Sequence, residues 1–503
     1  MTNGAPSTAP GSKRVEFWDT TLRDAQQSLW ATRMSTDMMT PIVPVMDEAG
    51  YFNIEVGAGV MFDACVYHLK ENPFDRLRTL ARLLPKTPIS HGLRGQNVFS
   101  WDIVADDVID LVVPALVACG VRRLMVFDSM NDLRNTARII RIANDLGVYI
   151  IGLLVYTISP VHTDAYYAEK AKEYLALGVD DVELKDPASL LTPDRVRTLV
   201  PALKQAIAGD DGQSRARLHI HTHCTTGLGP LVCLDALDLG ADVFHTCTGP
   251  LANGASQPAV ELIAAEARNR GFEVPLDDAV LARIATYIRE LAIREGKPLG
   301  HPAAYDPAHY RHQVPGGMIS NLESQLAEIG MAGRMSELLE EIFRVREELG
   351  YPIMVSPLSQ FVAVQALLNL VQSERYGVVP VDIRKYALGW YGRPAVPIDP
   401  NLLDHLTEGA EPITERPGAL IPPMIERFRK DHGPFDSDED LILALFYKPK
   451  VMEEYRAAQA GKASARTLTP HTPVAKLIAE LAKRPEVSYL HVDKAGTKLT
   501  HVA

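Results

Sequence analysis

The sequence of 503 residues contains little cysteine, no long apolar run and no excess of positive charge. Its five cysteines are odd in number and include no Cys-x-x-Cys pair, which favours reduced thiols in the cytoplasm over a disulfide framework. No apolar run reaches the ~20 residues that a membrane-spanning helix needs, and residues 149–161, the longest candidate, fit a buried strand better. A formal net charge of -12 argues against nucleic acids and membrane surfaces as partners, because both require clustered positive charge.

The two ends of the chain differ in composition from the middle. Residues 1–14 are small, polar and rich in Pro and Gly without the apolar stretch of a signal peptide, so we expect a disordered tail. Residues 457–473 have the Ala, Gly, Ser, Thr and Pro content of a flexible linker. Residues 474–503 are expected to form a short helix and a hairpin around Lys494-Ala-Gly-Thr, a piece too small to be stable alone.

Between these ends, one pattern recurs from residue 16 to about residue 269: a short apolar run, a turn and an amphipathic helix. The eight runs are 16–18, 52–56, 89–93, 123–127, 148–155, 181–184, 218–221 and 242–245. Eight such units in about 250 residues indicate a (β/α)8 barrel. A doubly wound open sheet is the alternative, but it usually carries a Gly-rich phosphate turn where this chain has Asp19-Thr-Thr-Leu-Arg-Asp24. We therefore predict an α/β fold with a TIM barrel over residues 15–300.

Residues 301–456 are expected to form a second, mostly helical unit. Helical periodicity predicts long segments at 321–350 and 359–373, a shorter one at 437–446, and a Tyr/Trp/Pro-rich connector at 382–400. Within this unit, Ser356 precedes Pro357 and has the form of a helix N-cap. A role in a binding site is the other interpretation of Ser356, and both stay open at this point.

The stretch Leu218-His-Ile-His-Thr-His223 is the most informative for function. In a strand, side chains two apart point to the same side, so His219, His221 and His223 share one face. Three buried imidazoles are costly unless something hydrogen-bonds or ligates them, and histidine is the commonest metal ligand. An ordinary strand end with one core histidine is the alternative interpretation.

Barrel chemistry lies at the carboxyl ends of the strands, and several polar side chains follow those ends. They are Arg23, Asp24, Gln27, Glu55, Arg94, Asp128, Tyr156, Lys185, Asp186, His221, His223, Thr246 and Thr248. Asp24 can therefore meet His221 and His223, although alone it fits a helix cap or a partner for Arg23 equally well. A lysine ammonium cannot ligate a cation. Reaction of the neutral Lys185 amine with CO₂ would give a carbamate that behaves as a carboxylate. The spacing of the residues alone does not reveal whether this modification occurs.

Six motifs resemble one family, the biotin-dependent carboxyltransferases that act on 2-oxo acids. They are Phe17-Trp-Asp-Thr-Thr-Leu-Arg-Asp-Ala-Gln-Gln-Ser-Leu29, Gly92-Leu-Arg-Gly-Gln-Asn97, Phe127-Asp-Ser-Met-Asn131, Leu184-Lys-Asp186, His221-Thr-His223 and Pro315-Gly-Gly-Met-Ile-Ser-Asn321. This family includes the carboxyltransferase domain of pyruvate carboxylase, the oxaloacetate decarboxylase α-subunit and the 5S subunit of transcarboxylase. The similarity runs from about residue 15 to about residue 455.

The resemblance implies an enzyme that moves a carboxyl group between carboxybiotin and a 2-oxo acid of the pyruvate or oxaloacetate type, through an enolate. It implies a divalent cation (Zn, Co or Mn) on Asp24, Lys185, His221 and His223, with Lys185 carbamylated. It also places the 2-oxo acid on Gln27 and Arg94, Arg23 beside the metal, and a proton-relaying hydroxyl on Ser356, where the family usually has Thr. The helical unit is expected to close over the barrel mouth.

The chain also departs from the family pattern around the expected pocket. Gly57-Ala-Gly-Val-Met-Phe-Asp63 lacks the family's Thr, and His91, Gln26, Pro187 and residues 244–258 differ as well. The identity of the acceptor acid therefore stays open.

The resemblance further implies partners. The chain contains no Ala-Met-Lys-Met biotinylation motif and no ATP-binding domain, so we expect a separate biotin carboxyl carrier protein and a biotin carboxylase subunit. The terminal helix and hairpin resemble the segments that precede biotinyl domains, and we expect them to contact one of these partners. The family is oligomeric, which implies a homo-oligomer here.

Two rival interpretations remain. The related lyase and synthase barrels share Arg-Asp after strand one and His-x-His after strand seven, but they lack the Leu-Lys-Asp and Pro-Gly-Gly-Met segments found here. The altered pocket also fits a scaffold subunit that kept the fold and lost turnover.

Overall fold

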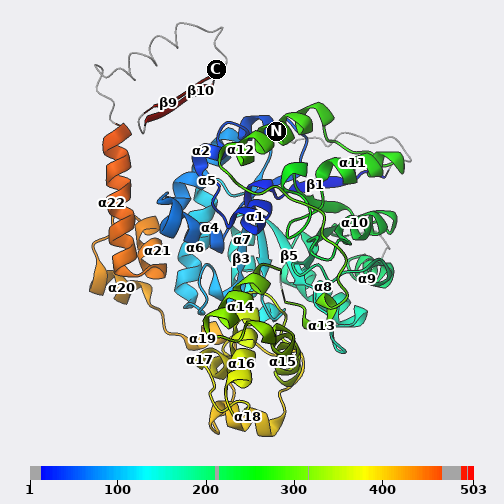
Figure 1. The fold of residues 1–503 in the computed structure, drawn as a ribbon. Coiled ribbons are helices and arrows are strands. Elements are labelled where there is room, and N and C mark those ends of the chain that lie inside the picture. Colours follow the sequence, from blue (N-terminus) through cyan, green and yellow to red (C-terminus); the bar gives the residue numbers. More distant parts are fainter. Residues whose placement is uncertain (1–12, 210–214, 315, 467–488, 495–496, 503) are drawn as a thin grey trace.

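A closed barrel of eight parallel strands, paired in sequence order, forms the centre of the molecule (Figure 1). The computed structural model describes residues 13–209, 215–314, 316–466, 489–494 and 497–502. The strands are β1 (Glu16–Asp19), β2 (Asn53–Ala58), β3 (Ile89–Arg94), β4 (Arg123–Phe127), β5 (Tyr149–Val155), β6 (Asp181–Asp186), β7 (Leu218–Thr222) and β8 (Val243–Thr246). Each strand lies on a run expected from the sequence, so the predicted TIM barrel is confirmed.

Helices surround the barrel and supply most of its apolar core. The longer ones are α5 (Pro73–Leu83), α6 (Asp106–Ala118), α7 (Ala137–Asp145), α8 (Asp164–Leu177), α9 (Pro193–Ala206), α10 (Gly229–Asp238), α11 (Val260–Asn269) and α12 (Asp278–Arg294). Local sequence fixes their ends. In α8, for example, the Thr163 hydroxyl accepts a hydrogen bond from the backbone N–H of Tyr166, and Gly178 ends the helix with φ +91°.

Short helical segments follow several of the strands. They are η1 (Thr21–Ala25), α1 (Gln26–Trp30), α2 (Thr36–Met39), α3 (Val43–Met46), α4 (Gly59–Asp63), η2 (Ala64–Leu69), η3 (Gly95–Asn97), η4 (Leu133–Asn135) and η5 (Gly249–Leu251). The π-helical turn η1 follows β1 after one residue and is fully buried. Such turns are rare and occur often at functional sites.

Gly152 in β5 offers a direct test of the packing between barrel and helices. A Cβ atom added there would lie 2.6 Å from the ring of Tyr174 on α8. We expect Gly152→Ala to lower the free energy of unfolding by about 1–3 kcal/mol, because an overpacked core must shift the ring or the strand. Gly333→Ala is the control, since a Cβ there meets nothing within 4 Å. Equal effects of the two substitutions in thermal or denaturant unfolding would contradict this account.

A second core, separate from that of the barrel, holds the helical unit together. Its helices are α13 (His309–His312), α14 (Gly316–Glu328), η6 (Ala332–Arg334), α15 (Met335–Glu348), α16 (Leu358–Val371), α17 (Val381–Ala387) and α18 (Pro400–Thr407). The single segment predicted at 321–350 is wrong in one respect: Gly330, with φ +75°, divides it into α14 and α15. The predicted connector 382–400 likewise contains most of α17.

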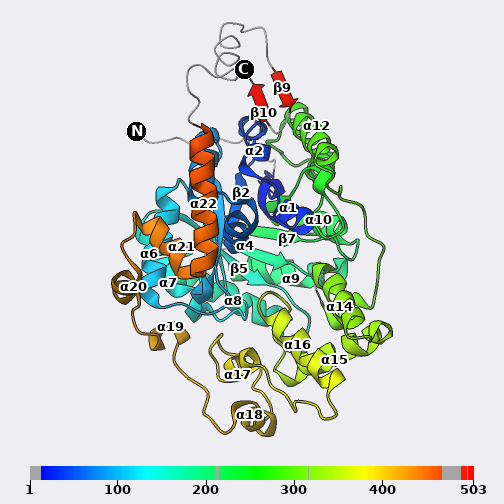
Figure 2. The same cartoon turned by 60° about the vertical axis from the view of Figure 1, so that its left-hand side comes forward.

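The helical unit contacts the loops that follow β4 and β5, so it lies at the carboxyl ends of the strands (Figure 2). The Arg346 guanidinium donates to the hydroxyl of Thr157 and to the carbonyl of Ile158. The Ser129 hydroxyl donates to the backbone carbonyl of Ser356 at 3.0 Å. That this unit closes over the barrel mouth stays a prediction.

The chain then returns to the side of the barrel through α19 (Pro417–Leu420), α20 (Ile425–His432), α21 (Asp438–Phe446) and α22 (Pro449–Arg466). On this side, the Tyr447 hydroxyl donates to Asp63 at 3.0 Å and Arg78 pairs with Glu439. In the part of the chain that the structure describes, no helix has the length and apolar character needed to cross a membrane.

The terminal segments correct two expectations. Helix α22 covers residues 457–466 of the predicted linker, because their alanines favour helix, and the rest of that linker lies outside the described residues. Lys13 and Arg14, predicted in the tail, contact Glu273. The predicted helix at 474–481 is outside the described residues. Strands β9 (Tyr489–Lys494) and β10 (Thr497–Val502) pair antiparallel, as expected for a hairpin.

Candidate active site at the barrel mouth

A cavity of about 340 Å³ opens at the carboxyl ends of the barrel strands. Its polar lining includes Arg23, Asp24, Gln27, Ser28, Arg94, Lys185, His223, Thr225 and Ser356, and its apolar floor consists of Met125, Phe127 and Leu153. Six of the residues predicted to lie at strand ends therefore line one cavity, together with Ser356 from the helical unit.

Four potential metal ligands lie close together at this cavity. The Nε2 atom of His221 is 3.2 Å from Asp24 Oδ2 and 3.4 Å from His223 Nε2. The Nζ atom of Lys185 is 3.2 Å from the same nitrogen and 3.5 Å from Asp24 Oδ2. All four residues are buried, and the Asp24, His221 and His223 ligand atoms lie within 4.8 Å of one another. Ligands of one cation stand at such separations, about 3–3.5 Å.

A hydrogen bond orients the His223 imidazole with a lone pair toward this point. The Nδ1–H of His223 donates to the Ala255 carbonyl at 2.6 Å, which leaves Nε2 unprotonated in the neutral ring. The Gln257 amide Nε2 donates to His223 Nε2 at 3.0 Å and lies 3.3 Å from His221 Nε2. Gln257 comes from the loop after β8, and we did not predict it from the sequence.

The electrostatics around Asp24 favour its charged form. Burial alone would raise the pKa of Asp24, but Arg23, His223 and Lys185 together lower it well below its usual range. The Arg23 guanidinium lies 3.2 Å from Asp24 and donates to Glu55 at 2.5 Å. Arg23 therefore lies beside the ligand cluster and is held there by the carboxylate of Glu55, which was predicted to follow the second strand and lies within β2.

Arg94 has a different environment, because it has no ion pair among the described residues. Its Nη1 donates to the Ser100 carbonyl at 3.3 Å, whereas its Nε is buried without a hydrogen-bond partner in that part of the chain. Burial lowers the pKa of Arg94 to about 10, against the opposing influence of Asp63 and Asp128. A guanidinium at this pKa is still protonated near neutral pH, so Arg94 brings to the cavity a positive charge that forms no ion pair within the described residues.

Ser356 borders the cavity and is not a helix cap. Helix α16 has Pro357 at its N-cap position and no side-chain cap, so the N-cap interpretation is wrong. The Ser356 hydroxyl instead accepts a hydrogen bond from Gln360 at 3.2 Å. The backbone of Ser356 is held by the Ser129 contact, and the residue lines the cavity.

Other residues that were predicted at strand ends form hydrogen bonds within the loops. Asp128 accepts from the backbone N–H groups of Met130 and Asp132, and Asp186 accepts from those of Leu190 and Leu191. The backbone N–H of Thr248 donates to the Thr21 hydroxyl. These contacts stabilise loop conformations, and none of these three predicted residues lines the cavity.

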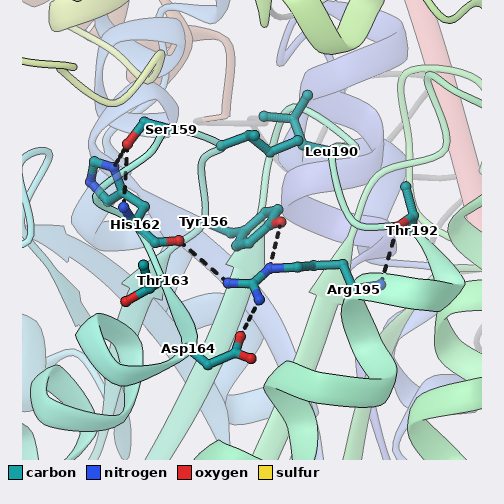
Figure 3. A pocket seen from close by; sticks show the side chains of 9 residues that line it. Tyr156, Ser159, His162, Thr163, Asp164, Leu190, Thr192 and Arg195 are labelled. Atoms are coloured by element: carbon teal, nitrogen blue, oxygen red, sulfur yellow. Dashed lines mark hydrogen bonds and ion pairs between the residues drawn. The ribbon is translucent and has the colours of Figure 1, made fainter.

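Tyr156 lines a separate cavity of about 440 Å³ beside the loops after β5 and β6 (Figure 3). There Arg195 pairs with Asp164 and donates to the Tyr156 hydroxyl and the His162 carbonyl. The guanidinium has partners on each side, so the geometry indicates a structural network between two loops.

Comparisons with known proteins agree with the geometry. Residues 310–497 match the family model described as "Conserved carboxylase domain". The chain is 39% identical over 471 residues to a pyruvate carboxylase subunit of Methanocaldococcus jannaschii, covering 92% of this chain and 81% of that protein. It is 34% identical over 454 residues to the methylmalonyl-CoA carboxyltransferase 5S subunit of Propionibacterium freudenreichii subsp. shermanii, covering 88% of each.

The chain belongs to the biotin-dependent carboxyltransferase family. Its fold superposes on the carboxyl transferase domain of Rhizobium etli pyruvate carboxylase with pyruvate, with a TM-score of 0.83 and 25% identity over 97% of this chain and 83% of that one. The carboxyltransferase prediction is thereby confirmed, and the chain is an enzyme of this class. The scaffold and acyl-CoA lyase alternatives have no support among these relatives.

Proposed function

We propose that this carboxyltransferase moves a carboxyl group between carboxybiotin on a separate carrier protein and a 2-oxo acid of the pyruvate type. The observation that carries the proposal is the position of Arg94: a guanidinium without an ion pair among the described residues lines the same cavity as Asp24, Lys185 and His223. A 2-oxo acid needs a cationic group for its carboxylate, and Arg94 supplies it. It also needs an electrophile for its keto oxygen, which a cation bound by the cluster around Asp24 would supply.

The buried cluster fits a divalent cation, held by Asp24, His221, His223 and Lys185. Nitrogen and oxygen donors of this kind suit Zn, Co or Mn. Lys185 becomes a ligand when its neutral amine adds to CO₂. This addition forms an N–C bond and releases the amine proton, and an oxygen of the resulting carbamate is the ligand atom. A cation bound there would act as a Lewis acid toward the keto oxygen of the substrate.

Arg94 and Gln27 bind and orient the acid in this proposal. The planar guanidinium of Arg94 matches a carboxylate with two parallel hydrogen bonds. Gln27 lines the cavity, and its side-chain carbonyl accepts from the Arg23 guanidinium at 3.5 Å, which leaves its NH₂ group available to the substrate. Arg23 adds positive charge where the enolate oxygen develops, and the apolar floor limits the access of water.

Ser356 transfers the proton that the proposed reaction requires. Carboxybiotin supplies CO₂, and its ureido nitrogen must gain a proton as the C–N bond breaks. The Ser356 hydroxyl gives its proton to that nitrogen and takes one from the methyl group of the 2-oxo acid. The enolate carbon then forms the new C–C bond with CO₂, and the hydroxyl is restored.

We expect Ser356→Ala to reduce kcat by about 10²–10⁴-fold, the contribution of one positioned proton-transfer group. The KM of the 2-oxo acid should change little, because Arg94 still binds it. Ser356→Thr keeps the hydroxyl and should retain most of the activity. Decarboxylation of oxaloacetate in the presence of free biotin measures both variants. Equal activities of the alanine and threonine variants would contradict the role of Ser356.

The proposed reaction itself is tested by carboxyl exchange. Full-length protein is incubated with ¹⁴C-labelled oxaloacetate, unlabelled pyruvate and biotin carboxyl carrier protein, and the label on the carrier is measured with and without avidin. Avidin-sensitive labelling is expected. A panel of other 2-oxo acids and of acyl-CoA thioesters in the same assay identifies the acceptor, and labelling from acyl-CoA thioesters alone would overturn the proposal.

We also propose that the chain assembles with a biotin carboxyl carrier protein, a biotin carboxylase subunit and copies of itself, and that residues 474–502 contact one of the first two. Deletion of residues 467–503 leaves α22 intact. We expect this deletion to lower carrier-dependent turnover at least 10-fold and to leave turnover with free biotin unchanged. Equal loss with both substrates, or no loss, would contradict a docking role.

A further inference from the structure

Arg346 is a buried arginine near the end of α15 that the proposed reaction does not use. It is 2% exposed, and it forms no ion pair in the part of the chain that the structure describes. Burial lowers the pKa of Arg346 to about 10, so the guanidinium is still charged at neutral pH. A buried cation without a counter-ion is costly, and hydrogen bonds must offset that cost. The acceptors of these hydrogen bonds therefore show what the residue holds together.

The guanidinium joins the barrel to the helical unit through three neutral oxygens. Its Nη2 donates to the Thr157 hydroxyl at 2.9 Å and to the Ile158 carbonyl at 3.0 Å, in the loop after β5. Its Nε donates to the Pro352 carbonyl at 2.9 Å, in the segment between α15 and α16. Because a guanidinium is planar and its N–H groups have fixed directions, these contacts fix Pro352 relative to the barrel loop.

Further hydrogen bonds hold the barrel side of this bridge. The Thr157 hydroxyl donates to the side-chain carbonyl of Gln313 at 2.9 Å, and the backbone N–H of Ile158 donates to the same oxygen at 3.2 Å. The Gln313 amide donates back to the Ile158 carbonyl at 2.8 Å. Thr157 is buried, and so is Gln313. Arg346 therefore bonds to two acceptors whose positions other contacts already determine.

The other side of the bridge leads to Ser356. Residues 352–356 connect α15 to α16 outside any helix, and part of this segment lines the cavity at the barrel mouth. Barrel loops hold the segment at both its ends, the Pro352 carbonyl through Arg346 and the Ser356 carbonyl through the Ser129 hydroxyl at 3.0 Å. Loss of the Arg346 contacts would leave the position of the Ser356 hydroxyl to the second attachment alone.

We propose that Arg346 is a positioning residue, which fixes residues 352–356 so that the Ser356 hydroxyl stays within reach of the reacting atoms. This inference rests on the proposed role of Ser356. Proton transfer requires hydrogen-bond reach, and a displacement of about 1 Å can cost roughly 10²-fold in rate. Substrate binding should not depend on Arg346, because Arg94 lies at the end of β3, on a different loop.

A double-mutant cycle with Ser356 tests the proposal. We expect Arg346→Met to reduce kcat for oxaloacetate decarboxylation with free biotin about 10–10²-fold and to leave KM unchanged. In the Ser356→Ala background, the same substitution should change kcat less than about twofold, because the hydroxyl that it displaces is already absent. Leu338→Ala is the control for destabilisation: it opens the core of the helical unit on the same helix, and below its unfolding temperature it should keep normal kcat.

Three results overturn the proposal: an unchanged kcat in Arg346→Met, a further fall of about 10-fold in the Ser356→Ala background, or an equal loss in Leu338→Ala. If Ser356→Ala keeps full activity, the proposed proton transfer fails, and a crystal structure of Arg346→Met decides the positioning role alone. Displacement of residues 352–356 supports that role, and an unmoved segment overturns it.

Thr157→Val replaces Arg346→Met in the cycle if the methionine variant does not fold. Valine has nearly the shape of threonine and removes one acceptor of the guanidinium. We expect a smaller fall in kcat at unchanged KM, which again disappears in the Ser356→Ala background. A normal kcat in Thr157→Val, or the same fall in both backgrounds, would overturn the proposal.

Discussion

Replacement of Lys185 by alanine is expected to lower the rate of carboxyl transfer at least ~10³-fold. The Lys185 amine lies 3.2 Å from His221 Nε2 and 3.5 Å from Asp24, so its loss removes one of four proposed ligands. The substitution thereby weakens a Lewis acid worth several kcal/mol in the transition state. Initial rates of oxaloacetate decarboxylation with free biotin, together with zinc content, measure both effects.

A second measurement follows the carbamate itself. Protein equilibrated with ¹³C-bicarbonate should show one carbamate carbon by NMR, and Lys185→Ala should lack it. Lys204→Ala is the control, because this lysine pairs with Asp242 on the outside of the barrel and should keep normal activity. If Lys185→Ala retained more than a tenth of the activity, or if the carbamate signal survived the substitution, lysine ligation would be wrong.

The second large effect is expected at Arg94. Arg94→Gln should raise the KM of the 2-oxo acid roughly 10²-fold, since losing a charge-assisted bidentate contact to a carboxylate costs up to about 3 kcal/mol. Arg94 forms no ion pair within the described residues, so no protein carboxylate has to leave it before the substrate binds. This makes a large effect of the substitution on KM more certain to follow from the lost contact. Arg94→Lys keeps the charge and loses the fork, so an intermediate KM is expected.

Steady-state kinetics with varied 2-oxo acid at saturating biotin carrier check the Arg94 prediction. Arg138→Gln is the control, because its guanidinium is paired with Asp106 and Asp110 on the surface of α6 and α7. A rise in KM of the same size in both variants, or no rise in Arg94→Gln, would show that the substrate carboxylate binds elsewhere.

The barrel could be predicted from the sequence because each of its units is specified locally. A run such as 124–127 is apolar, and the helix Asp164–Leu177 has its own cap and stop residues beside it. The predicted elements were wrong where a single residue or a tertiary contact determined the end of a helix. Gly330 divided one predicted helix into two, and the alanines after residue 456 continued a helix into the predicted linker.

The residues of the site also fall into those that the sequence could predict and those that it could not. Asp24, Lys185, His221 and His223 could be predicted, because the carboxyl ends of barrel strands must meet whatever the loop details. Gln257 could not be predicted, because it comes from a loop whose path the sequence does not specify.

By itself, the sequence determined the eightfold strand–helix repeat and the polar side chains at the strand ends. Both depend on local periodicity and on the rule that parallel strands end at one rim. Only the tertiary structure decided which buried groups share an interior layer, that Arg94 has no carboxylate partner within the described residues, and that Ser356 borders the cavity from a second unit. Those facts depend on the stagger between strands and on how the helical unit packs on the barrel, and no single segment encodes either.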